Sequence, residues 1–130
     1  MKCAERITDI LRRHPEVQVA WLFGSAASGR LTPDSDLDVA VLGRGPLSAA
    51  ATKPLIEQMA QACRRPVDLV DLQATHGPIV GRVLQEGERL FCDDTTLYAD
   101  LMKRHMFDQA DWLPLRRRIL DIRRRAWIES

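Results

Sequence analysis

The chain has 130 residues, of which 45% are hydrophobic and 28% charged, and its formal net charge is +1. This length predicts one globular domain with its own core, and no run approaches the roughly 20 apolar residues that a membrane span requires. The first residues, MKCAERITDILRRH, have an amphipathic helical pattern and lack the apolar centre of a signal peptide.

Hydrophobic periodicity predicts an alternation of helices and short strands. A helix over residues 5–13 should end before Pro15, and a strand over residues 17–23 should end at Gly24. A short helical turn from Ser25 and a loop over residues 30–35 follow. Further along, the pattern predicts helices over 48–63 and 75–86, and strands over 36–42, 67–72 and 88–92. Together these elements predict a small mixed sheet with helices packed on it, an α+β fold.

The end of the chain is expected to be helical. The Asp-Asp-Thr sequence at residues 93–95 predicts a cap, and apolar residues at spacings of three and four follow it. We expect Pro114 to kink or restart this region. The single domain is therefore expected to comprise a core of about residues 1–94 and a helical extension of about residues 95–130.

Basic residues gather in this extension. From residue 101 onward there are eight Lys and Arg against four Asp and Glu, whereas the preceding part has eleven against fourteen. Arginines 116–118 and 123–125 flank an apolar strip at helical spacing. Two interpretations stay open: a solvated basic face over a packing strip, or a surface that docks against an acidic partner. Direct nucleic-acid binding is not expected, because few aromatic side chains accompany these arginines.

The three cysteines are far apart in the sequence. Cys3, Cys63 and Cys92 have no zinc-site spacing and no obvious disulfide framework. We therefore expect them to act as small hydrophobic core residues in a reducing cytoplasm.

The stretch GSAASGRLTPDSDLD, residues 24–38, carries the predicted chemistry. Asp36 and Asp38 are two apart at the start of a predicted strand, so their side chains share a face. Two neighbouring carboxylates repel each other unless a cation lies between them, and hard divalent ions take oxygen ligands. Gly24 lets the backbone approach a ligand closely, and a helical turn beginning at Ser25 would direct free N–H groups toward phosphate. This combination predicts a nucleotide-handling site.

The sequence has a predicted strand followed by Gly-Ser, ten further residues, Asp-x-Asp and a second predicted strand. This order resembles the signature of the nucleotidyltransferase superfamily that includes DNA polymerase beta. The chain is similar to its minimal (MNT) branch and, more narrowly, to MntA-like antitoxins encoded beside HEPN-type toxins. The similarity runs from about the first helix to Cys92. It implies a polymerase-beta-like nucleotidyltransferase fold.

The resemblance also implies roles for individual residues. A third carboxylate on the neighbouring strand would complete the metal site, and Asp68 matches it, with Asp71 as the alternative. Asp36, Asp38 and Asp68 would then hold Mg²⁺, in a site with room for two ions. Gly24 and Ser25 would bind the phosphates of ATP. For Arg30, a phosphate contact and a solvated loop position are both open.

The motif does not identify the acceptor of the nucleotide. The chain leaves little room for an acceptor-binding domain of its own, so we expect a second protein to supply the acceptor. The resemblance implies a type VII-like antitoxin that transfers AMP from ATP to a tyrosine of a HEPN ribonuclease toxin. The alternatives are an antitoxin that neutralises the toxin by binding alone and an antibiotic-modifying nucleotidyltransferase.

Overall fold

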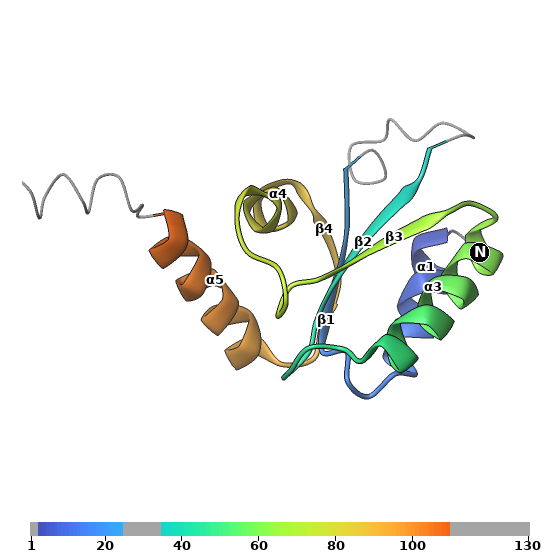
Figure 1. Cartoon of the computed structure of the whole chain (residues 1–130), viewed down its shortest axis with the longest axis horizontal. Coiled ribbons are helices and arrows are strands. Elements are labelled where there is room, and N and C mark those ends of the chain that lie inside the picture. The colour runs from blue at the N-terminus through green and yellow to red at the C-terminus, as the bar shows by residue number, and fades with distance from the viewer. Residues whose placement is uncertain (1–2, 25–34, 110–130) are drawn as a thin grey trace, which may run out of the picture.

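The computed structural model describes residues 3–24 and 35–109 (Figure 1). Eight elements follow each other in these ranges: α1 (Cys3–Arg12), β1 (Val19–Phe23), β2 (Leu37–Leu42), α3 (Ala49–Cys63), β3 (Val67–Asp71), α4 (Pro78–Glu86), β4 (Glu88–Cys92) and α5 (Thr95–Gln109). Pro114 and the arginines at 116–118 and 123–125 lie outside the described residues.

The four strands form one mixed sheet in the order β3-β2-β1-β4. β1 is antiparallel to both of its neighbours, β2 and β4, whereas β2 and β3 are parallel and are joined through α3. The α+β class and the small mixed sheet are thus confirmed.

Helices cover both faces of the sheet (Figure 1). On one face, α1 and α3 bury Ile7, Leu11, Leu55 and Met59 against the sheet. On the other face, the apolar side chains of α4 and α5 pack against the strands; this cluster contains Val19, Trp21, Phe23, Ala40, Leu42, Leu72, Val80, Val83 and Leu101. Because β1 is central and covered on both faces, all of its residues are buried.

Local sequence signals explain where the helices begin and end. Ser48 caps α3, with its hydroxyl accepting a hydrogen bond from the amide of Ala51. Asp94 caps α5 in the same way, because its Oδ1 accepts from Leu97 N at 3.0 Å. α4 begins at Pro78, three residues after the predicted start, since Gly77 has a φ of +98° that no helix allows.

The prediction for two of the cysteines was wrong, because Cys3 and Cys63 form a disulfide. These residues are 60 positions apart, but α1 packs against α3 and brings their Cα atoms to 5.5 Å. That separation lies within the range that a disulfide requires. The helix pairing is a tertiary contact, which no spacing of cysteines along the sequence indicates. Cys92 is free.

We expect Cys3→Ser to lower the free energy of unfolding of the oxidised protein by up to about 4 kcal/mol, because the bridge closes a long loop in the unfolded chain. Urea unfolding with and without a reductant measures this difference. The reductant should destabilise the native protein and leave the variant unchanged. A native protein whose unfolding is insensitive to reductant would contradict the disulfide.

None of the helices in the described ranges is long and apolar enough to cross a membrane.

Candidate active site

Two of the predicted site residues lie directly side by side in the sheet. Asp38 of β2 and Asp68 of β3 are register partners in the parallel pair. Paired strands lie about 4.8 Å apart, and partners in a parallel ladder direct their side chains to the same face. Asp36 precedes β2 by one residue, two positions before Asp38.

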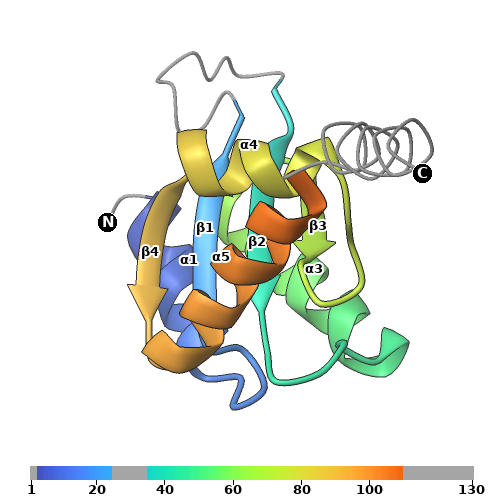
Figure 2. The same ribbon diagram turned by 90° about the vertical axis from the view of Figure 1, so that its left-hand side faces the viewer.

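The carboxylates project from the face of the sheet that α4 and α5 cover. Ala40 and Leu42 of β2 belong to the cluster on that face, and alternation along the strand assigns Asp38 and Asp36 to the same side. α4 crosses the sheet near the end at which β1 finishes and β2 and β3 begin (Figure 2). At this end Asp38 is half-buried, while Asp36 and Asp68 are exposed to solvent.

The electrostatics of Asp38 reflect this crowding. Burial raises the pKa of the Asp38 carboxyl above its ordinary value, and the negative charges of Asp68 and Asp36 raise it further. The positive charge of Arg82 on α4 acts in the opposite direction and lowers this pKa. Asp38 is therefore close enough to Asp68 and to Asp36 to be repelled by both, and a bound cation would relieve that repulsion.

Gly24 closes the site on the side of β1. It directly follows Phe23, which pairs with Asp38 across the antiparallel ladder. The φ of Gly24 is +66°, and a Cβ at this position would overlap Oδ2 of Asp38. A glycine is therefore required twice over, once for the backbone conformation and once for the close approach of the carboxylate. Ser25 and Arg30 lie outside the described residues, and their phosphate contacts stay predictions.

Asp71, the alternative third carboxylate, has a different environment. It pairs with Val41, three positions along the ladder from the Asp38–Asp68 pair. Its Oδ2 accepts from Leu47 N at 2.7 Å and its Oδ1 accepts from Gln73 N at 3.0 Å. These bonds hold the segments around Leu47 and Gln73 at the end of β3 opposite to Asp68. The structure thus brings Asp68, and not Asp71, to Asp36 and Asp38.

The donor set fits a hard divalent cation, because it consists of carboxylate oxygens whose mutual repulsion a cation offsets. Among the described residues, however, no three His, Cys, Asp or Glu side chains are gathered closely enough to form a ready-made metal site. The carboxylates are neighbours without being a complete coordination shell.

Sequence reasoning missed Arg82, whose charge acts on Asp38. This arginine is far from the motif in the sequence, and no spacing marks it. Only the path of α4 over the end of the sheet brings it to the site (Figure 2).

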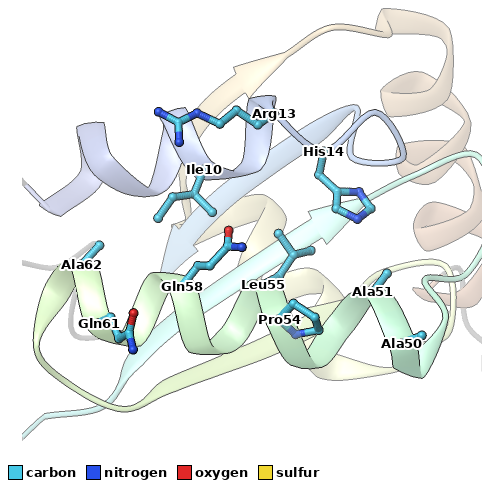
Figure 3. A pocket seen from close by; sticks show the side chains of 10 residues that line it. All are labelled: Ile10, Arg13, His14, Ala50, Ala51, Pro54, Leu55, Gln58, Gln61 and Ala62. Carbon is cyan, nitrogen blue, oxygen red and sulfur yellow. The ribbon is translucent and has the colours of Figure 1, made fainter.

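A cavity of about 730 Å³ lies elsewhere, between α1 and α3 (Figure 3). Its lining is mixed and includes Ile10, His14, Leu55 and Gln58. This cavity belongs to the face of the sheet opposite the carboxylates, and no predicted site residue lines it.

Gly24→Ala is expected to reduce the nucleotidyl transfer predicted from the sequence at least tenfold, because the new methyl group displaces the Asp38 carboxylate. The unfavourable φ should also cost about 1 kcal/mol of stability. Label transfer from nucleotide and urea unfolding measure the two effects. Gly45→Ala is the matched control, since a Cβ there meets nothing within 4 Å. Equal activity of the two variants would contradict the close approach.

Comparison with known proteins identifies a family and several proteins that this chain resembles. Residues 5–96 match the family described as polymerase beta, nucleotidyltransferase. Over 87 residues the chain is 34% identical to the protein adenylyltransferase MntA of Shewanella oneidensis, a match that covers 66% of this chain and 63% of that relative. The matched part therefore spans less than two thirds of the relative's length.

Two solved structures resemble the whole described fold. A crystal structure of a toxin–antitoxin with AMP-PNP contains a chain with a TM-score of 0.71 and 28% identity, covering 90% of this chain and 98% of that one. The structure of a tri-AMPylated Shewanella oneidensis HEPN toxin in complex with MNT antitoxin gives a TM-score of 0.66 and 26% identity, covering 91% and 96%.

Proposed function

We infer a function from the fact that this chain belongs to the polymerase beta nucleotidyltransferase family. The proposed function is that of an antitoxin which transfers AMP from ATP to a tyrosine of a partner HEPN ribonuclease toxin and so neutralises it. The observation that carries this proposal is the alignment of Asp38 with Asp68, beside Asp36 and Gly24, at one end of the sheet. The names of the similar proteins, an adenylyltransferase and an antitoxin complexed with an AMPylated toxin, support it.

In the proposed reaction the acceptor hydroxyl attacks the α-phosphorus of ATP. The bond from the α-phosphorus to the bridging oxygen breaks, pyrophosphate leaves, and AMP stays on the acceptor. Asp36 and Asp38 would hold two Mg²⁺ ions with the triphosphate, and Asp68 would hold one of them and take the proton of the hydroxyl. The bound ions supply positive charge that neutralises the phosphates. Gly24, Ser25 and Arg30 are proposed to position the phosphates.

The proposed division of labour assigns the nucleotide chemistry to residues 1–94 and partner binding to the helical extension from residue 95. Within the described part of this extension, Met102, Met106 and Phe107 of α5 are 41%, 65% and 81% exposed. Large apolar side chains exposed together are typical of a surface that another protein covers. This exposure supports a docking role for α5.

The second candidate is an antitoxin that neutralises the toxin by binding alone. The exposed apolar side chains of α5 fit this candidate equally well. The placement of Asp36 and Asp68 near Asp38, which their charges repel, favours the enzyme, because a pure binding surface has no use for it.

Cytoplasmic action is part of the proposal, because the proposed target is a ribonuclease. A reducing cytoplasm would keep Cys3 and Cys63 as neighbouring thiols. Alkylation of the protein in intact cells, followed by mass analysis, reports the state of this pair.

One experiment separates the candidates. The protein is mixed with the product of the neighbouring gene, ATP and Mg²⁺, and the intact mass of the partner is measured. A gain of one or more AMP units supports adenylylation, whereas tight binding with an unchanged mass supports the binding antitoxin. If the partner is neither bound nor changed in mass, and AMP is found instead on an aminoglycoside or a related drug, the result supports an antibiotic-modifying enzyme.

A further inference from the structure

Arg82 is the central residue of α4. This helix crosses the end of the sheet at which β2 and β3 begin (Figure 2). The buried side chains of Val80 and Val83 anchor α4 to the sheet. At its end, Gly87 approaches the backbone of β1 so closely that a Cβ would come within 3.2 Å of the carbonyl oxygen of Leu22. The backbone that carries Arg82 is therefore held firmly relative to β1 and β2.

The guanidinium of Arg82 is free to meet a ligand. Its side chain is 59% exposed, and its one ion-pair partner in the described ranges is Glu86, at 4.0 Å. A solvent-exposed pair at this distance is weak. The charge of Arg82 acts on Asp38, but the two side chains form no ion pair within 4.0 Å. The positive charge on α4 is therefore near the carboxylates of β2 and β3 without being paired directly with Asp38.

We propose that Arg82 binds the terminal phosphates of the nucleotide triphosphate held at Asp36, Asp38 and Asp68. This inference rests on the proposed function and names a further substrate-binding residue for it. A triphosphate placed beside three carboxylates carries more negative charge than two divalent ions neutralise, so an additional cation stabilises the complex. Arginine suits this role, because its planar fork of N–H donors matches phosphate oxygens in pairs.

A different role for Arg82 would be to neutralise the empty carboxylate cluster. The two roles differ in their effect on metal binding. If Arg82 binds phosphate, Arg82→Ala weakens the binding of a triphosphate but does not weaken the binding of a metal ion alone. Removing a nearby positive charge should even raise the affinity of the carboxylates for the metal ion modestly.

The test compares the full-length protein with Arg82→Ala, Arg82→Lys and Glu86→Ala. Calorimetry measures the affinity for AMP-PNP with Mg²⁺ and for AMP, and electron paramagnetic resonance measures Mn²⁺ binding without nucleotide. We expect Arg82→Ala to weaken AMP-PNP binding about tenfold or more relative to the native protein. Its affinity for AMP should stay within about twofold of the native value, and its affinity for Mn²⁺ should equal or exceed the native value. Arg82→Lys should lie in between. Glu86→Ala is the matched control and should keep or raise AMP-PNP affinity, because it frees the guanidinium.

Unchanged AMP-PNP affinity in Arg82→Ala would overturn the proposal, as would an equal loss for AMP and AMP-PNP or weaker Mn²⁺ binding. The same losses in Glu86→Ala would show that the two residues act together in helix structure, which also overturns it. A failure of the proposed function looks different. In that case the native protein leaves the mass of the partner unchanged, whatever Arg82→Ala does to AMP-PNP binding.

Discussion

Replacing both Asp36 and Asp38 with alanine is expected to lower the transfer of label from α-labelled ATP to the partner by at least about 1,000-fold. These carboxylates would hold the ions that neutralise the triphosphate, and such charge stabilisation is worth several kcal/mol in the transition state, with each 1.4 kcal/mol giving a factor of about ten. The fold should survive the change. Asp36 is exposed, and removing two of three repelling charges does not destabilise the native state.

The matched control for this variant removes the same charge elsewhere. Asp9 of α1 and Glu57 of α3 are exposed acidic residues on the other face of the sheet. Asp9→Ala combined with Glu57→Ala should keep full transfer activity. Label transfer that persists in the Asp36 and Asp38 variant, with unfolding unchanged, would remove the mechanism.

The second large effect is a contrast between two variants: Asp68→Asn should lose activity but keep its stability, whereas Asp71→Asn should lose stability but keep most of its activity. Asp68→Asn should reduce label transfer by at least about 100-fold while stability stays equal or rises, because a metal ligand is lost and a repulsion is relieved. Asp71→Asn should keep most of the activity. It should lower the free energy of unfolding by about 1–3 kcal/mol, since Asp71 accepts from two backbone amides, those of Leu47 and Gln73.

Both variants are measured by label transfer and by urea unfolding under identical conditions. The opposite effects of the two variants are informative, since a general loss of structure would reduce activity and stability together. A stable, inactive Asp71→Asn beside an active Asp68→Asn would assign the third carboxylate to Asp71 and refute the geometric assignment.

Much of the fold follows from local patterns in the sequence. The strands from residue 36 and residue 67 begin within a residue of their predicted positions, and the caps at Ser48 and Asp94 are those that the residue types indicate. The grouping of Asp36 with Asp38 needed only the two-residue period of a strand. Local chemistry was sufficient in each of these places.

The third carboxylate could not be decided from the sequence, because the choice depends on the register between β2 and β3. Asp68 and Asp71 both lie on the same short strand, and their order along it leaves the pairing open. The crossover through α3 sets that register, and it places Asp68 opposite Asp38. The same packing of α3 produces the Cys3–Cys63 disulfide.

Arg82 illustrates the same limit for the site itself. Asp38, on which its charge acts, is 44 residues away in the sequence, and the sequence of its own helix predicts only a solvent-facing arginine. The path of α4 across the ends of β1 and β2 is a property of the whole sheet.

The most direct measurement is a crystal structure of the full chain with Mn²⁺ and an ATP analogue that cannot be cleaved between its α- and β-phosphates. We expect anomalous scattering from Mn²⁺ between Asp36, Asp38 and Asp68, with the triphosphate extending toward Gly24. Nucleotide bound instead in the cavity between α1 and α3, or Mn²⁺ at a site without these three carboxylates, would contradict an adenylyl transfer centre at this end of the sheet.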